Sequence, residues 1–364
     1  MLEMPLHPVD RTHLEVLTDH IGIMQHAAGS VPDPAHGYCV DDVARALQVD
    51  LLHARQLGWP AVAANARRCL AFLVEAFDAS SGRFRNFRLV DGSWVAGVAS
   101  EDCQGRAMHA LGDAIAAAPE PAVAQTASAL FERALPGTHD LAALRAISSV
   151  ALGCEAAIRG GSQGAAVQLF SLMADRLWAA FEPGIAMEWP WTEDRLTYEN
   201  GLPVRALIVA GQHHAHPGMV QAGIGVLEWL VVAQTAPEGH LSPIGNEWWA
   251  IDGSRSTFDQ QPIEATTLML AAEAAHQATG DDRWTTVMER AYAWFLGHND
   301  LGIPVADPER GGCHDGLMRD GVNRNQGAES TLMWLVALEH TRTMRADRAR
   351  PATGTRARAM ASVA

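Results

Sequence analysis

The chain has 364 residues, a formal net charge of −15 and a hydrophobic fraction of 48%, so it can bury a large core. Its acidic balance argues against a nucleic-acid partner, because phosphate neutralisation needs a basic surface. All 27 basic residues are arginine, and the absence of lysine excludes Schiff-base enzymes, pyridoxal-phosphate enzymes and the P-loop. We find no signal-peptide pattern and no run of about 18 apolar residues, and therefore expect a cytoplasmic protein without a membrane partner.

Helix signals with a 3.6-residue period recur along the chain, whereas strand signals are scarce. After the first helix, the segments pair as long helix, short turn, long helix, with turns such as Gly58-Trp59-Pro60 and Gly280-Asp281. The pattern predicts twelve helices, at residues 11–26, 40–57, 61–77, 101–117, 121–134, 140–159, 164–181, 198–214, 217–234, 261–278, 281–298 and 327–343.

Twelve helices in six hairpins predict an all-α protein with an (α/α)6 toroid fold. Inner helices then begin near residues 40, 101, 140, 198, 261 and 327, and helix 11–26 becomes the outer partner of the last one. Segments 83–90 and 93–99 predict one small β-hairpin within a loop. An α-solenoid is the alternative, but its repeats are expected to be more uniform in length.

We expect residues 1–344 to form this single domain and residues 345–364, rich in Arg, Ala, Thr and Pro, to be a disordered tail. The five cysteines are scattered and never form a C-x-x-C motif. They are expected to be reduced core residues, and the sequence predicts no metal site and no cofactor.

Carboxylates open five of the six predicted inner helices. If these helices are parallel, the acids converge on one mouth of the toroid, where paired carboxylates can perform acid–base chemistry. The residues concerned are Asp41, Asp42, Glu101, Asp102, Glu199, Glu264 and Glu329. A simpler reading remains open, because first-turn acids stabilise a helix dipole by ~0.3–1 kcal/mol. In that reading Asp41–Arg45 and Asp102–Arg106 are local i,i+4 ion pairs.

Amides and indoles surround these acids in the loops, in numbers that capping does not require. Amides suit the recognition of hydroxyl groups, and indoles stack on the C–H faces of sugars. We therefore expect substrate-binding roles for Asp41, Glu101, His36, Tyr38, Asn86, Glu188, Trp189, Trp191, Tyr198, Asn200, Trp248, Trp249, Gln260, Gln261, Asn325, Gln326 and Glu329. The alternative for the tryptophans is ordinary packing beneath the loops.

Five motifs in this chain resemble a known family. They are HGYCVDDVARAL, SEDCQGRA, WPWTEDRLTYENGLP, FDQQPIEA and GVNRNQGAEST. They are similar to those of six-hairpin glycosidase-like domains found alone or behind group-1-type glycosyltransferases in bacteria, often beside mannoside-processing genes. The resemblance implies the toroid fold and a carbohydrate substrate, possibly containing mannose. More distantly, Asp42 followed by Asp102 resembles the aspartate pair of unsaturated glucuronyl hydrolases, and the tandem aspartates resemble those of α-mannanases.

Three functional hypotheses follow. The first is a glycoside hydrolase acting on an oligosaccharide, with Asp42 and Asp102 as the leading acid/base pair and Glu199 and Glu264 in reserve. The second is a sugar epimerase or isomerase, which needs a histidine base, for which His36 and His314 are the loop candidates. The third is a non-catalytic module that holds a glycan for a glycosyltransferase partner.

Overall fold

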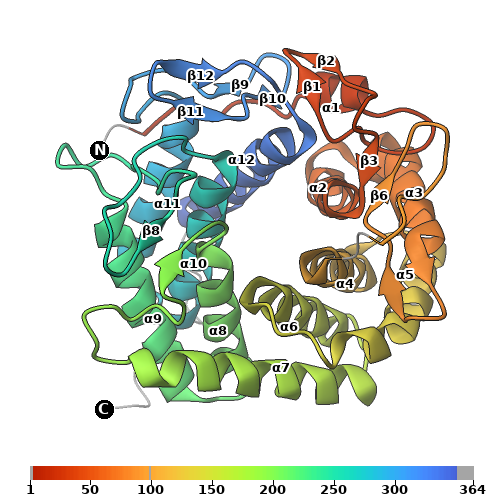
Figure 1. Cartoon of the computed structure of the whole chain (residues 1–364), viewed down its shortest axis with the longest axis horizontal. Coiled ribbons are helices and arrows are strands. Elements are labelled where there is room, and N and C mark those ends of the chain that lie inside the picture. The colour runs from red at the N-terminus through yellow and green to blue at the C-terminus, as the bar shows by residue number, and fades with distance from the viewer. Residues whose placement is uncertain (1–2, 98–99, 351–364) are drawn as a thin grey trace.

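The computed structural model describes residues 3–97 and 100–350, and this part of the chain forms twelve α-helices in two concentric rings (Figure 1). Each inner helix contacts the next, and the last contacts the first, so the inner ring is closed. The fold is therefore the expected (α/α)6 toroid. The inner helices are α2 (Val40–Leu57), α4 (Glu101–Ala117), α6 (Leu144–Arg159), α8 (Gly201–His213), α10 (Pro262–Thr279) and α12 (Ala328–Ala349).

Each outer helix packs against its inner partner. Proline in the first turn and glycine at the preceding or following boundary mark several of the short turns that connect inner to outer helices. The outer helices are α1 (Thr12–Leu17), α3 (Trp59–Ala76), α5 (Pro121–Ala134), α7 (Ala165–Phe181), α9 (Pro217–Ala233) and α11 (Arg283–Phe295).

The first helix is much shorter than expected. The prediction of a helix over residues 11–26 is wrong beyond Leu17, although α1 does pack against α12. The reason is local: the Asp19 carboxylate accepts hydrogen bonds from the backbone N–H groups of Ile21 and Gly22, at 2.8 and 3.2 Å. This Asx-type turn competes with helical hydrogen bonding.

The last helix is longer than expected. Helix α12 continues to Ala349, so the prediction of disorder from residue 345 is wrong for residues 345–349. Arg345 secures this end through hydrogen bonds to both carboxylate oxygens of Glu289 on α11, at 2.7 and 2.5 Å. The rest of the predicted tail, residues 351–364, lies outside the described residues.

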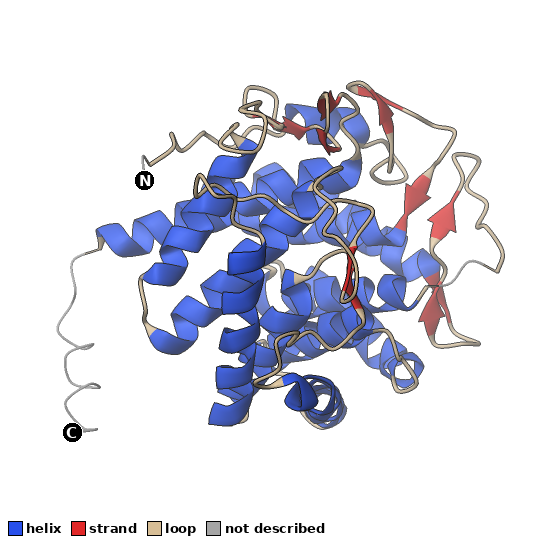
Figure 2. Ribbon diagram, turned by 60° about the vertical axis from the view of Figure 1, so that its left-hand side comes forward, coloured by secondary structure: helices blue, strands red, loops and turns tan. Residues whose placement is uncertain are grey.

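All strands lie in the links that lead from an outer helix to the next inner helix, outside the helical rings (Figure 2). The loops therefore gather at the end of the ring where the inner helices begin. The antiparallel pairs are β1 (Ala27–Ala28) with β2 (Val31–Pro32), β3 (Tyr38–Cys39) with β6 (Phe87–Arg88), β4 (Phe77–Asp78) with β5 (Arg83–Phe84), β7 (Arg195–Leu196) with β8 (Trp249–Ala250), β9 (Ala306–Asp307) with β10 (Gly312–Cys313), and β11 (Gly316–Met318) with β12 (Gly321–Asn323). Two 3-10 helices, η1 (Leu135–Thr138) and η2 (Glu182–Gly184), precede α6 and α8.

The predicted β-hairpin is found in part. The backbone N–H of Leu89 donates to Ser93 O and that of Val95 donates to Phe87 O, at 2.8 and 2.9 Å, so the chain turns back near Asp91. Residues 83–84 pair instead with residues 77–78, and residues 98–99 lie outside the described part.

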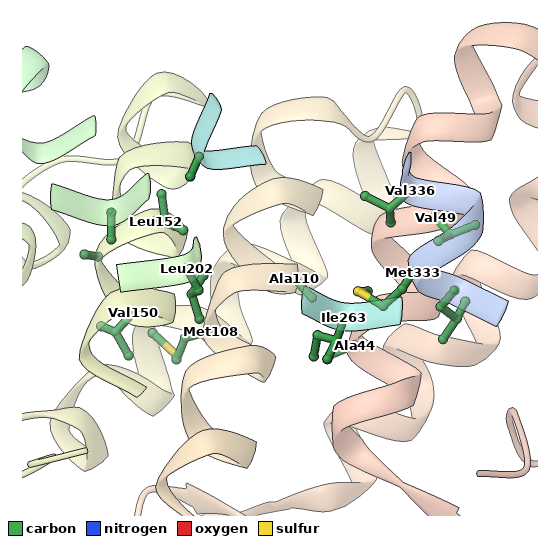
Figure 3. Packing of buried hydrophobic residues seen from close by; sticks show 14 of the residues in the cluster. Ala44, Val49, Met108, Ala110, Val150, Leu152, Leu202, Ile263, Met333 and Val336 are labelled. Carbon is green, nitrogen blue, oxygen red and sulfur yellow. The ribbon is translucent and has the colours of Figure 1, made fainter. Parts of the chain in front are cut away.

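The inner ring is sealed by apolar side chains from neighbouring helices, such as Met108, Val150, Leu202, Ile263 and Met333, all buried (Figure 3). Helices α4 and α6 approach most closely where Gly112 faces Gly153, because a Cβ on either residue would collide with the opposite backbone. All five cysteines are free and buried, which confirms their expected place in the core. Among the helices of the described residues, none combines the length and apolarity that a membrane crossing requires.

Candidate active site

The starts of the inner helices are linked by charged side chains. At the centre lies Arg106, in the second turn of α4. Its guanidinium contacts three carboxylates: Glu199 before α8 at 2.7 Å, Asp41 on α2 at 3.1 Å, and Asp102 on its own helix at 3.7 Å. Helices α2, α4 and α8 line the same central region of the ring (Figure 1). The predicted convergence of Asp41, Asp102 and Glu199 on one mouth is therefore seen in these contacts.

A second arginine extends the contacts to α12. Arg45 on α2 lies 3.0 Å from Asp42 Oδ1 and 3.0 Å from Glu329 Oε2. The other Asp42 oxygen accepts a hydrogen bond from the thiol of Cys39 at 3.1 Å. We use the name mouth network for Asp41, Asp42, Arg45, Asp102, Arg106, Glu199 and Glu329.

Glu199 takes an unusual backbone conformation, with φ of 53°, in the left-handed region that non-glycine residues rarely occupy. Glu264, the first-turn acid of α10, supports this conformation. Its buried carboxylate accepts hydrogen bonds from the backbone N–H of Glu199, from the Asn200 side chain at 2.9 Å and from the Asn200 backbone at 3.4 Å. Glu264 therefore anchors the segment that presents Glu199 to Arg106.

Tyr198 contributes the most exposed polar group beside the network. Its hydroxyl donates to Asp102 Oδ2 at 2.5 Å, and the ring remains 38% exposed. The Arg145 guanidinium lies 4.5 Å from the centre of this ring and donates to Thr197 Oγ1 at 2.7 Å and to Asn200 Oδ1 at 3.3 Å. Arg145 thus fixes the loop that carries Tyr198, Glu199 and Asn200.

The environment shifts the pKa values of these carboxyl groups in opposite directions. Burial raises the pKa of Asp42 to about 6, although Arg45 opposes this effect. Burial likewise raises the pKa of Glu264 to about 7. Burial acts in the same sense on Glu199, but the Arg106 and Arg45 guanidinium groups outweigh it, and the pKa of Glu199 is lowered.

Two of the helix-start acids have contacts that differ from the sequence interpretation. The i,i+4 ion pair expected between Asp41 and Arg45 is not formed; Asp41 pairs with Arg106, 65 positions away, and Arg45 pairs with Asp42 and Glu329. Glu101 accepts the backbone N–H groups of Ala142 and Ala143 at 2.8 and 2.6 Å. Its carboxylate therefore caps the start of α6.

Four predicted binding residues are buried and engaged within the protein, which places them away from a substrate. Tyr38 donates its hydroxyl to Asp19 at 2.5 Å. Asn86 contacts Ser100 at 3.4 Å, and Gln260 accepts the indole N–H of Trp294 at 3.0 Å. The Gln326 carbonyl contacts the His13 ring at 2.8 Å. These contacts serve the packing of the loops.

The remaining polar candidates are not brought to the network by any described contact. His36 is exposed and packs edge-on against His26. Glu188 and Asn325 are exposed, and the Asn325 side chain accepts the backbone N–H of Gly29 at 3.0 Å. Gln261 is half-buried at the cap of α10. Their binding roles stay predictions.

The four loop tryptophans divide into three environments. Trp191 is only 3% exposed and packs against Phe181 of α7, so it belongs to the core and does not meet the expectation of partial exposure. Trp189 and Trp249 lie 5.1 Å apart and both pack on Trp229 of α9. Trp248 is 40% exposed and is the indole best placed to meet a ligand.

Sequence reasoning missed the arginines that connect the acids. Arg45 and Arg106 were interpreted only as local ion-pair partners, and Arg145 was not considered. The available signal was the recurrence of an arginine three or four residues after a first-turn acid, in VDDVARAL and EDCQGRA. On inner helices, that spacing places the guanidinium one turn below the helix start, where neighbouring helices also reach it.

Comparison with known proteins shows the fold. No family model matches the sequence, and no curated protein matches it. Among solved structures, cellobiose 2-epimerase from Spirochaeta thermophila DSM 6192 is similar, with a TM-score of 0.69, 13% identity, and coverage of 91% of this chain and 92% of that chain. D-mannose isomerase has a TM-score of 0.66, 9% identity, and coverage of 92% and 96%. The GH76 α-mannanase from Bacteroides thetaiotaomicron has a TM-score of 0.60, 8% identity, and coverage of 86% and 88%. The chain thus shares the six-hairpin glycosidase-like toroid with these enzymes.

Proposed function

We propose that this protein is a glycoside hydrolase that cleaves an oligosaccharide by carboxylate acid/base catalysis at the mouth network. The observation that carries the proposal is the pair Asp42 and Glu199. Both are buried in one network, yet the pKa of Asp42 is raised to about 6 while that of Glu199 is lowered. Carboxyl groups whose pKa values are pushed apart are suited to act as a proton donor and an ionised partner.

We assign the proton donor to Asp42 and the ionised partner to Glu199. Arg106 and Arg45 favour the charged form of Glu199, whether it activates water or attacks the sugar directly. Asp102 was the leading partner on sequence grounds. It lies in the same network, and its hydrogen bond from Tyr198 supports a role in binding a sugar hydroxyl beside that tyrosine.

The network favours hydrolysis over epimerisation. Across residues 3–97 and 100–350, no histidine forms a hydrogen bond or ion pair with a member of the mouth network. His36, one of the two candidate bases, packs on His26. An open-chain mechanism therefore lacks a histidine base among these contacts, although several toroids of known structure are epimerases or isomerases.

Other features support the setting of this activity. Five free, buried cysteines are typical of a reducing compartment, which supports a cytoplasmic oligosaccharide. The resemblance to domains attached to glycosyltransferases supports a substrate made or used by such an enzyme, and one containing mannose is the first to test.

The test is turnover of manno-, gluco- and galacto-oligosaccharides by the wild type and by Asp42→Asn, Glu199→Gln and Asp102→Asn. We expect the first two variants to lower kcat by ~10²–10⁴-fold, as removal of acid/base groups does. A smaller loss is expected for Asp102→Asn. A larger loss in Asp102→Asn than in Glu199→Gln would exchange the two assignments.

Asp50 offers a matched control. It lies on the same helix as Asp42, is buried, has its pKa raised to about 6 by burial, and pairs with Arg11 at 2.6 Å. It contacts α1 and α3 residues rather than the mouth network. Asp50→Asn is therefore expected to lower stability while kcat stays near the wild-type value.

Two outcomes would overturn the proposal. Exchange of deuterium from heavy water into C2 of a free sugar, without cleavage of any oligosaccharide, would assign epimerisation or isomerisation. Tight binding of an oligosaccharide without any product over long incubation would assign a glycan-binding module.

A further inference from the structure

Arg106 connects three helices rather than forming one local ion pair. A simple i,i+4 pair would hold Asp102, but that contact is the longest of the three, at 3.7 Å. The shorter contacts go to Glu199, 93 positions away and in the segment before α8, and to Asp41 on α2. The side chain itself is largely shielded from solvent, so these contacts act in a medium of reduced dielectric.

We propose that Arg106 is a positioning residue of the active site, which holds Glu199 and Asp41 at fixed places around the mouth so that Glu199 can act on the sugar. The inference rests on the proposed hydrolase function. It assigns to Arg106 a role that acts through Glu199, since the guanidinium already donates to protein carboxylates and needs no contact with substrate.

The charges around Glu199 explain why one arginine matters. Arg106 and Arg45, from α4 and α2, and Arg145, from α6, favour its ionised form, whereas burial disfavours it. Glu264 from α10 binds its backbone, and His109 of α4 lies near enough to interact with it electrostatically.

Without Arg106, a buried carboxylate would lose the closest of its counter-charges. Glu199 would then be driven to take up a proton or to turn away from the mouth.

The decisive variants are Arg106→Met, which removes the charge and keeps an unbranched apolar stem, and Arg106→Lys, which keeps a charge without the fork geometry. Arg345 is the matched control. Its side chain is 13% exposed, as is that of Arg106, and it pairs with the buried Glu289 between α12 and α11, away from the mouth. Arg345→Met therefore tests loss of a similar ion pair elsewhere in the fold.

For Arg106→Met we expect kcat to fall by ~100-fold, with KM changed only a few-fold, because the catalytic carboxylate is affected rather than the sugar contacts. The acidic limb of the kcat/KM profile should move to higher pH, since Glu199 then ionises at higher pH. Arg106→Lys should show a smaller shift of the same sign, and it carries the test if Arg106→Met does not fold. Arg345→Met should lower stability and leave both limbs in place.

A titration that needs no substrate separates this inference from the proposed function. Carboxyl ¹³C NMR of the wild type identifies Glu199 as the signal lost in Glu199→Gln. In Arg106→Met the midpoint of that signal should rise, even if no oligosaccharide is found to be cleaved. An unchanged midpoint, or an unchanged acidic limb with a stability loss equal to that of Arg345→Met, would show that Arg106 is only structural and overturn the inference.

Discussion

The mouth network and the tryptophan loops were both expected to meet the sugar, yet the structure uses them differently. The tryptophan loops are residues 185–198 and 246–253, joined by the pairing of β7 with β8. The acids of the mouth network face one another through Arg45 and Arg106. Most of the indoles instead pack against one another or against outer helices.

This difference has a geometric cause. A residue in the first turn of an inner helix has its position set by the helix and by the closed ring, so several such residues must meet at one end. A residue in a long link is free to turn inward, and a large apolar ring gains from doing so. In this toroid, position at a helix start is therefore a better indicator of a site than the composition of a loop.

The largest expected effect that sharpens the comparison concerns Trp191. Trp191→Ala should lower the free energy of unfolding by ~3–5 kcal/mol, the usual range for a buried tryptophan, because the indole packs on Phe181 and donates to Glu193. Denaturant unfolding measures the loss, and KM of the folded fraction should match the wild type. A raised KM with normal stability would return Trp191 to the list of sugar-binding residues.

Glu264 separates support of the site from catalysis. At a pH above about 7, where the group is ionised, Glu264→Gln places an amide against donors from Glu199 and Asn200 and should cost ~1–3 kcal/mol of stability. Glu273→Gln, further along α10, is the control, because a glutamine oxygen can still accept from the His340 ring. Equal losses in the two variants would contradict the anchoring role of Glu264.

The fold was predictable to the extent that local signals decide it. The starts of α2 and α4 at Val40 and Glu101 agree with the predicted starts, because turn and first-turn signals are read along the chain itself. The exception, helix 11–26, failed because one side chain, Asp19, bonds the backbone two and three residues on. Propensity and periodicity do not contain that choice.

The site was predictable in its acids but not in its connections. Asp41, Asp42, Asp102 and Glu199 meet as the parallel inner helices require. The partner of Asp41, however, is Arg106 and not Arg45, since the choice depends on the distance between two helices rather than on spacing within one. The same limit applies to Trp191, whose inward orientation is set by α7.

The pH dependence of activity follows from the two shifted carboxyl groups. Asp42 must hold a proton to donate it, and its pKa of about 6 predicts that kcat/KM falls about tenfold per pH unit above that value. Because the pKa of Glu199 is lowered, the acidic limb should lie below 4.5, the ordinary glutamate value. A profile flat through pH 6 would remove Asp42 as the acid.

The smallest effect, and the sharpest comparison within the tryptophan loops, concerns Trp248. This indole is 40% exposed, and Arg195 lies over its ring at 5.8 Å, so its removal should change stability by less than about 0.5 kcal/mol. If it stacks on a sugar ring, the contact exists in both the ground state and the transition state. Trp248→Ala should then raise KM a few-fold and leave kcat unchanged.

Trp249→Ala is the paired control, because Trp249 packs on Trp189 and Trp229 and its loss should appear mainly in stability. Together the two variants ask whether neighbouring indoles in one loop have separate roles. A Trp248→Ala enzyme with unchanged KM on every cleaved oligosaccharide would remove the last of the four tryptophans from the sugar site. Recognition would then rest on the mouth network and on Tyr198 beside it.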